Sequence, residues 1–354
     1  MNNNKTIEEC SKDRKNNYDF IRFVAAILVI ISHAYPLTSH NNEILVVLSN
    51  GQWSLGAMAV AIFFIISGFL IVQSFDRNPN LFKFIKARVL RIYPGLIVAV
   101  FFCAFIVGPL VTTLSIKEYF SDSNTYNYLK TILLFPMYWT LPGVFESSSF
   151  NNSVNGSLWT LPFELLCYST VAFFGVLGLL KFRKLMLFVF ISSMYIKSFL
   201  MIYIPTGFTW VYLPSFFELL PFFLAGVVFY LYRDKIILNH WYALFSFILL
   251  CISAKFGGLV NNFALFGSYL IMYLAYSKFI KLQNFSKYGD FSYGIYIYAF
   301  PIQQSITYFF NGEISVLLNI AFSIPLTIIL AVLSWHLIEK PVLKLKNRSI
   351  FQIR

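Results

Sequence analysis

Two ionisable side chains share one face of an apolar stretch that runs from Tyr18 to Pro36. Arg22 and His33 are eleven residues apart, which in an α-helix is close to three whole turns and about 16 Å along the axis. Because hydrocarbon penalises a charge without a partner, a membrane helix with two such groups on one face is expected to line a site. The alternative is that Arg22 reaches the cytoplasmic headgroups and His33 caps the outer end.

A carboxylate and a tryptophan near the start of a later apolar stretch suggest partners for His33. The stretch opens with NGSLWTLPFELLCY, which places Trp159 near the outer interface and Glu164 roughly 9 Å inside it. A carboxylate beside an imidazole fixes its tautomer and raises its basicity, as a general base requires. Trp159 is either an aromatic-belt residue or a platform for a sugar ring.

Two arginines lie on one helical face in ARVLRIYPGL. Arg88 and Arg91 are three residues apart and therefore neighbours on a helix. Guanidinium groups bind phosphate oxygens through paired hydrogen bonds, so this pair suits a phosphate clamp at a cytoplasmic mouth. An ordinary cluster of positive charge at the cytoplasmic side is the alternative.

Small residues interrupt another apolar run, FFIISGFLI. Ser67 and Gly68 let a neighbouring helix approach closely, and this packing role is the simplest interpretation of the motif. Ser67 could also line the groove of a site.

Lys197 and Glu218, the other charges inside apolar runs, suit a pair across neighbouring helices, either structural or catalytic.

The composition is that of a polytopic helical membrane protein. Of the 354 residues, 58% are hydrophobic and only 12% are charged, so a water-soluble domain could not cover its surface. Lys and Arg collect in cytoplasmic loops of such proteins, so the net charge of +12 does not indicate nucleic acid. The four cysteines and four histidines have no metal-ligand spacing, and we expect no metal site.

Ten apolar segments are long enough to cross a hydrocarbon core of about 30 Å. They are Ile21–Tyr35, Gly56–Phe75, Ile92–Leu114, Leu158–Leu180, Leu185–Ile204, Pro214–Tyr232, Trp241–Phe256, Val260–Phe279, Phe291–Phe310 and Ile314–Leu337.

The distribution of positive charge predicts the orientation of these segments. Most of the 27 Lys and Arg residues lie in the two tails and in every second connection, and the other side has only Lys117, Lys130 and Lys255. Both termini are therefore expected in the cytoplasm. We expect a disordered polar tail over residues 1–17, a single transmembrane domain over 18–341 and a basic cytoplasmic tail over 342–354.

Taken together, the motifs resemble the bacterial acyltransferase-3 family of integral membrane proteins, which acylate envelope and exported glycans. The likeness rests on the Arg-then-His first helix, FFIISGF, ARVLRIYP, GSLWTLPFE, the closing IEKP and SYGIYIYAFPIQQ from Ser292 to Gln304. It extends from about Asn17 to Pro341.

The resemblance implies a bacterial inner-membrane O-acetyltransferase, with cytoplasmic acetyl-coenzyme A as donor and a hydroxyl of a lipid-linked or polymeric glycan, such as O-antigen or capsule, as acceptor. By matching positions, His33 would be the catalytic histidine and Arg22 its motif partner, with Arg88 and Arg91 in the donor-binding region. His33 would either deprotonate the acceptor hydroxyl or carry the acyl group transiently.

This chain departs from the family pattern in two respects. Many relatives have a histidine where this chain has Ala299, so that position has no catalytic role here. Some relatives also carry a fused extracytoplasmic hydrolase-like domain, which we do not recognise in this sequence. We therefore expect the membrane domain to complete the transfer itself or to pass the acyl group to a separate extracytoplasmic partner.

A transporter or flippase for a glycan or lipid-linked precursor is the alternative function. Ten spans, an intramembrane histidine and basic cytoplasmic loops fit that class as well. A purely structural membrane subunit would leave Arg22 and His33 on one face unexplained. Consumption of acetyl-coenzyme A in isolated membranes would distinguish an enzyme from a flippase.

Overall fold

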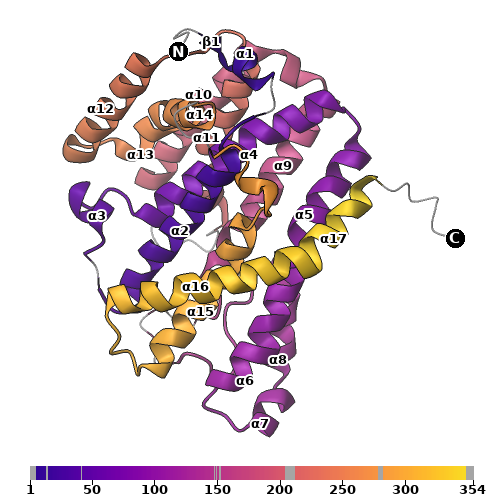
Figure 1. The fold of residues 1–354 in the computed structure, drawn as a ribbon, viewed down its shortest axis with the longest axis vertical. Helices are drawn as coiled ribbons and strands as arrows, with labels where there is room; N and C mark the ends of the chain where they lie inside the picture. The colour runs from indigo at the N-terminus through magenta and orange to yellow at the C-terminus, as the bar shows by residue number, and fades with distance from the viewer. Residues whose placement is uncertain are drawn as a thin grey trace, which may run out of the picture. The chain divides into compact units, whose positions relative to one another are not determined.

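The computed structural model is almost entirely helical (Figure 1) and describes residues 5–12, 15–40, 42–146, 148, 150, 153–203, 212–277 and 282–347. The chain divides into two compact units, each built from three separate segments. Unit 1 comprises the described parts of Met1–Ala25, Ile44–Phe84 and Phe163–Lys287. Unit 2 comprises those of Ala26–Glu43, Ile85–Pro162 and Tyr288–Arg354.

Unit 1 contains a small two-stranded sheet and the helices of the first and middle parts of the chain. Its elements are β1 (Lys5–Thr6), α1 (Ile7–Ser11), the start of α2 (Tyr18–Leu37), α3 (Ile44–Leu48), α4 (Leu55–Arg77), most of α9 (Leu161–Val176), η4 (Leu179–Lys181), α10 (Arg183–Tyr203), α11 (Tyr212–Leu231), β2 (Ile237–Leu238), α12 (His240–Phe256), α13 (Leu259–Asn262), η5 (Phe263–Gly267), α14 (Ser268–Ala275) and η6 (Phe285–Lys287).

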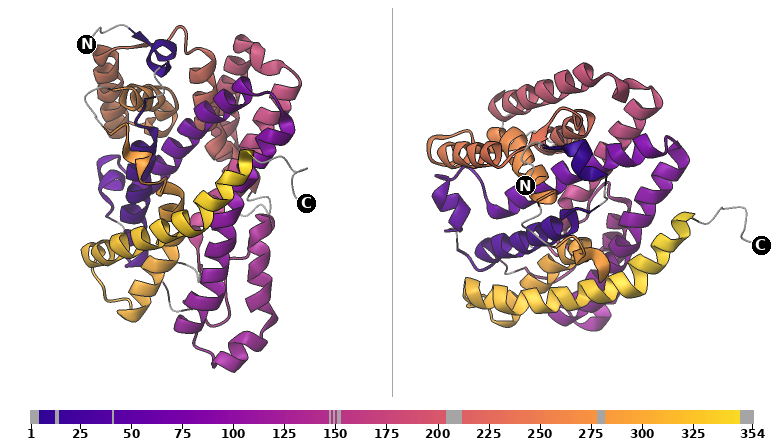
Figure 2. Two further views of the ribbon diagram at one scale, coloured as in Figure 1. Left: turned by 45° about the vertical axis from the view of Figure 1, so that its right-hand side comes forward. Right: turned by 45° about the horizontal axis from the view of Figure 1, so that its top comes forward.

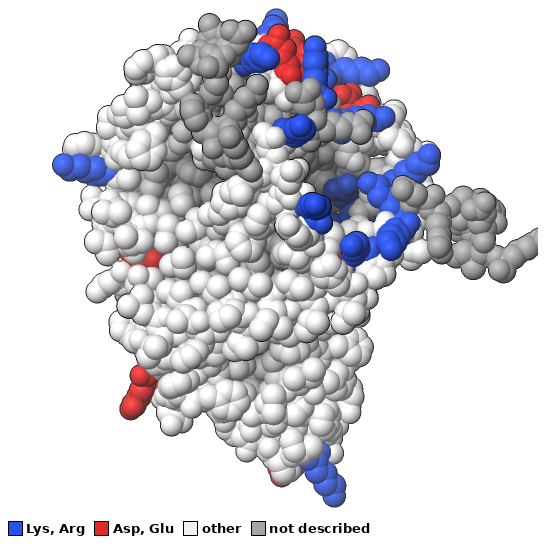
Figure 3. All heavy atoms as spheres, viewed as in Figure 1, with Lys and Arg blue, Asp and Glu red and all other residues white. Residues whose placement is uncertain are grey.

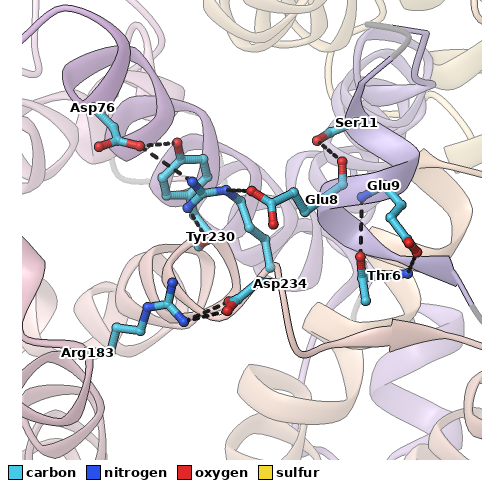
Figure 4. Close-up of polar contacts among 9 residues, drawn as sticks. Thr6, Glu8, Glu9, Ser11, Asp76, Arg183, Tyr230 and Asp234 are labelled. Carbon is cyan, nitrogen blue, oxygen red and sulfur yellow. Dashed lines mark hydrogen bonds and ion pairs between the residues drawn. The ribbon is translucent and has the colours of Figure 1, made fainter.

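The first described residues of unit 1 are folded, so the expectation of a disordered N-terminal tail is wrong for residues 5–12. β1 pairs antiparallel with β2, and Thr6 and Glu9 form a capping box that starts α1. Ile7 is fully buried. Figure 4 shows the hydrogen bonds between Thr6 and Glu9 and the one that Tyr230 donates to Asp76. Glu8 and Asp76 each lie 3.7 Å from the Arg233 guanidinium, which ties this segment to the end of α11.

Glycines bring α4 and α11 of unit 1 into close contact. A methyl group added at Gly68 would collide with the carbonyl oxygen of Phe223, and one added at Gly226 would collide with that of Ile65. Two helices approach this closely only where the interface lacks side chains. The packing interpretation of Ser67-Gly68 is therefore confirmed, and the helix that approaches Gly68 is α11.

Unit 2 contains the remaining helices and is built around α15 and α16, which lie side by side in both views (Figures 1 and 2). Its elements are the rest of α2, most of α5 (Leu81–Phe102), η1 (Cys103–Val107), α6 (Gly108–Val111), α7 (Ile116–Ser121), α8 (Ser123–Asn127), η2 (Tyr128–Leu133), η3 (Gly156–Thr160), α15 (Ser292–Phe309), α16 (Val316–Ser334), η7 (Trp335–Glu339), α17 (Lys340–Leu343) and η8 (Lys344–Asn347).

Each of the ten predicted apolar segments contains a described helix, although some predicted ends, such as residues 112–114, are not helical, and the structure is that of a polytopic helical membrane protein. The predicted ends at Ile204 and Phe279, and the tail after residue 347, lie outside the described residues. Six described helices are long and apolar enough to cross a membrane: Tyr18–Leu37, Leu55–Arg77, Leu81–Val111, Gly156–Val176, Leu213–Leu231 and Val316–Lys346.

The surface drawn in Figure 3 matches this class. Broad stretches of it carry none of Lys, Arg, Asp and Glu, as expected for helices that contact lipid. On the same face, Lys and Arg side chains gather over α5 and α17 of unit 2.

Candidate active site

His33 lies in the part of α2 that belongs to unit 2, one turn before the end of this uninterrupted helix. Its ring meets Phe300 of α15 edge to face, with 5.3 Å between the ring centroids and an angle of 83°. The Nδ1 atom is buried and has no hydrogen-bond partner among the described residues. The imidazole is therefore held by packing, and one of its nitrogens is available for a proton or an acyl group.

A buried amide network holds α2 against α15 beside His33. Gln303 donates through Nε2 to the carbonyl oxygen of Ile30 at 2.8 Å and to Asn319 Oδ1 at 3.1 Å. Asn319 in turn donates to Thr307 Oγ1 at 3.0 Å. Because Ile30 precedes His33 by less than one turn, Gln303 sets the rotation of α2 and thus the direction of the imidazole. In the sequence Gln303 stands out only as part of the motif SYGIYIYAFPIQQ, which does not indicate a contact with α2.

The GSLWT motif packs against the same stretch of α15. A methyl group on Gly156 would lie 2.8 Å from the ring of Phe300, so η3 approaches α15 closely there. Asn155 donates to the carbonyl oxygen of Ile297 at 2.8 Å, and the hydroxyls of Thr160 and Tyr296 are hydrogen-bonded at 2.8 Å. Half-buried Trp159 belongs to this short helix. Two motifs that are far apart in the sequence thus meet beside the ring that contacts His33.

Three further residues near these motifs have a bearing on the site. Ala299 is fully buried in α15. Ser157 of η3 is fully buried, and its hydroxyl has no hydrogen-bond partner among the described residues. Glu43 is also buried, and it accepts a hydrogen bond from Ser32, the residue before His33, at 3.2 Å. Neither Ser157 nor Glu43 was predicted, although a buried carboxylate in this setting is a functional candidate.

Arg91 is engaged by acidic residues at the other end of α15. Its guanidinium lies 2.7 Å from Asp290 and 3.4 Å from Glu339, and it packs over the ring of Tyr293. Glu339 is buried and ends the π-helical turn η7. These pairs bind α5 to the ends of α15 and α16, so Arg91 has a structural role whatever else it contacts.

Arg88 lies one turn before Arg91 on α5. It is close enough to Lys346 of η8 for the two positive charges to interact electrostatically. This pair belongs to the gathering of Lys and Arg over α5 and α17 (Figure 3). Along α15, Tyr293 beside Arg91 and Phe300 beside His33 are about 10 Å apart.

The remaining predicted residues belong to unit 1. Arg22 lies 4.0 Å from Asp19, one turn earlier on α2. Glu164 on α9 accepts a hydrogen bond from the hydroxyl of Tyr168. Ser67 is half-buried on α4. Because His33 belongs to unit 2, its pairing with Glu164 stays a prediction.

Lys197 and Glu218 lie on α10 and α11, which pack together in unit 1. Lys197 is buried, with its ammonium 5.1 Å from the centre of the Phe222 ring, and it interacts electrostatically with Glu218. The attraction between the two charges offsets part of the cost of burying the Lys197 ammonium.

Comparison with known proteins identifies relatives over most of the chain. A family model described as an acyltransferase domain matches residues 15–336. An O-acetyl transferase of Shigella phage Sf6 is 31% identical over 346 residues, which is 92% of this chain and 96% of that protein. Nodulation protein 10 of Rhizobium leguminosarum bv. viciae is 34% identical over 170 residues, 46% of this chain and 45% of that protein. No solved structure matches.

Proposed function

Because this chain belongs to the acyltransferase-3 family, we propose that it is an O-acetyltransferase that moves an acetyl group from acetyl-coenzyme A to a hydroxyl of a surface polysaccharide such as O-antigen or capsule. This chain is similar to an O-acetyl transferase along nearly the whole length of both proteins, which supports acetyl as the acyl group. We further propose ten spans in a bacterial inner membrane, with both termini in the cytoplasm. The ten apolar helices and the uneven distribution of Lys and Arg support this topology.

The observation that carries the proposal is the buried Nδ1 of His33, which has no hydrogen-bond partner among the described residues and lies on a helix of membrane-spanning length. Acyl transfer to a hydroxyl requires a group that takes up a proton, and a buried imidazole nitrogen can do this. In the proposed reaction His33 takes the proton of the acceptor hydroxyl and the hydroxyl oxygen attacks the thioester carbonyl. The carbon–sulfur bond then breaks, and the coenzyme A thiolate leaves and is protonated. A transient acyl-histidine remains the second route.

The donor is proposed to enter from the end of unit 2 where Arg88 and Lys346 lie. The two positive charges close to each other support a binding site for the phosphates of coenzyme A. Arg22 is proposed as a further phosphate contact. Arg91 is proposed to act indirectly, since its two carboxylate partners already hold it. Glu164 is proposed to orient His33, and Ser67 and Trp159 to line the groove.

Isolated membranes test this function. Membranes with the wild-type protein should release free coenzyme A and transfer labelled acetyl from acetyl-coenzyme A to surface polysaccharide purified from a deletion strain. His33→Ala should abolish both signals at matched protein level. His240→Ala, which changes a histidine at the start of α12 in unit 1, is the control and should retain them. A wild-type protein that exports the polysaccharide but consumes no acetyl-coenzyme A would be a transporter.

A further inference from the structure

We propose that the cavity between the C-terminal ends of α2 and α15 in unit 2 is the acceptor subsite and binds one sugar unit of the polysaccharide. This inference rests on the proposed function. The cavity has a volume of about 330 Å³, at the lower end of the range of small-ligand pockets. Its polar lining consists of the side chains of Ser39, Ser148, Gln304, Thr307, Tyr308 and Asn311.

The cavity lies one helical turn beyond His33. Leu37, four residues after His33 on α2, and Gln304, four residues after Phe300 on α15, both line it. Four residues of helix rise by about 6 Å, and the rings of His33 and Phe300 are already in contact. Gln304 is buried whereas Asn311 is exposed, so the cavity extends from the surface at Asn311 inward to Gln304. A sugar held there would present a hydroxyl toward the imidazole.

The chemistry of the lining fits a neutral, hydroxylated ligand. The lining residues that the structure describes include no Lys, Arg, Asp, Glu or His and therefore offer no charged partner to a phosphate or carboxylate. Hydroxyl and amide groups both donate and accept hydrogen bonds, which matches the hydroxyls of a sugar. The rings of Phe145 and Tyr308, with centroids 6.1 Å apart at 67°, supply the apolar surface on which the carbon face of a sugar packs.

Hydrogen bonds in the cavity wall hold the lining in place before any ligand binds. Ser148 donates to Gln304 Oε1 at 2.8 Å, and Gln304 Nε2 donates to the carbonyl oxygen of Ser153 at 3.1 Å. Thr307 is held by Asn319, the residue that also bonds Gln303 beside His33. These bonds tie the loop, α15 and α16 together, and such preorganisation lowers the entropic cost of binding.

Two substitutions, each of which removes one polar group, test the subsite without disturbing these hydrogen bonds. Asn311→Gly removes one amide at a position with φ of +52°, which glycine adopts freely, and Tyr308→Phe removes one hydroxyl. Matched controls are Asn50→Gly, at another turn with φ of +52°, and Tyr195→Phe, an exposed tyrosine of unit 1. The probe is de-O-acetylated surface polysaccharide purified from the deletion strain, assayed with acetyl-coenzyme A in membranes.

We expect each subsite variant to raise the KM for polysaccharide roughly three- to ten-fold, the effect of one lost hydrogen bond, with kcat and the KM for acetyl-coenzyme A unchanged. The controls should match wild type. Unchanged polysaccharide KM in both variants, or a raised KM for acetyl-coenzyme A instead, would overturn the subsite assignment while leaving the enzyme intact. A wild-type protein that transfers no acetyl group would instead remove the proposed function itself.

Discussion

Replacing Gln303 by leucine should impair both the stability and the chemistry of this protein. Gln303 is fully buried, and its amide donates to Ile30 of α2 at 2.8 Å and to Asn319 of α16 at 3.1 Å. Leucine removes both bonds with little change in volume, and it leaves Asn319 Oδ1 without this donor. The helix that carries His33 would lose a polar contact with α15.

The size of the effect follows from the two lost bonds. Hydrogen bonds between membrane helices contribute about 0.6 kcal/mol on average and at most about 1.7 kcal/mol. Two of them give a loss of roughly 1–3 kcal/mol in the free energy of unfolding. Such a loss should lower the midpoint of thermal unfolding by a few degrees. If α2 can then rotate, the imidazole leaves its productive direction, and kcat should fall about ten-fold or more.

Gln52→Leu is the matched control. Gln52 in unit 1 also donates from its amide to backbone carbonyls, those of Ser49, Ser253 and Ala254, at 2.8–3.1 Å. We expect both variants to lower the unfolding midpoint in detergent and only Gln303→Leu to lower kcat per folded molecule. If the two variants lose stability equally and retain the same kcat, Gln303 does not position His33.

Three further predictions follow from individual contacts. Gly68→Ala should destabilise unit 1 by about 1–3 kcal/mol, because the new methyl group collides with the carbonyl oxygen of Phe223; thermal unfolding measures this, and an unchanged midpoint would contradict the close packing. The Arg183 guanidinium holds the pKa of the Asp234 carboxyl below its usual range, so the pair stabilises the protein above the pKa of the unfolded carboxyl, and this contribution disappears as the pH falls through the lower folded pKa. Both side chains are about one-third exposed, so Arg183→Met should cost well under about 1 kcal/mol and leave a weaker acid dependence of unfolding; an identical pH profile would contradict the pairing. Arg88→Glu should raise the KM for acetyl-coenzyme A roughly ten-fold or more at normal protein level, and unchanged donor kinetics would remove Arg88 from the donor site.

Local features of the chain predicted most of the helices. Each of the ten apolar runs contains a described helix, because a helix satisfies the hydrogen bonds of its own backbone within an apolar stretch. The close approach at Gly68 could also be predicted, since a small residue in an apolar run has few other uses. The folded structure of residues 5–12 could not be predicted, because it depends on strand pairing with Ile237 and Leu238 far along the chain.

Predictions about the site were limited by the same dependence on distant residues. Arg91 looked like a free phosphate ligand because its partners, Asp290 and Glu339, lie about 200 and 250 residues later in the chain. Gln303 and Glu43 were overlooked for the same reason, since only the fold brings them to α2. In each case the sequence did contain an indication. A polar side chain inside or beside an apolar run is expected to have a polar partner, although the sequence alone does not identify which residue it is.

The most direct test of the central claim is proton NMR of the surface polysaccharide from the parent strain, a deletion strain, and the deletion strain complemented at matched protein level with wild-type protein or with His33→Ala. We predict that the O-acetyl signals disappear on deletion, return with the wild-type protein and stay absent with the alanine variant. O-acetyl signals that persist in the deletion strain, or that return in full with His33→Ala, would contradict the claim that this chain transfers acetyl groups through His33.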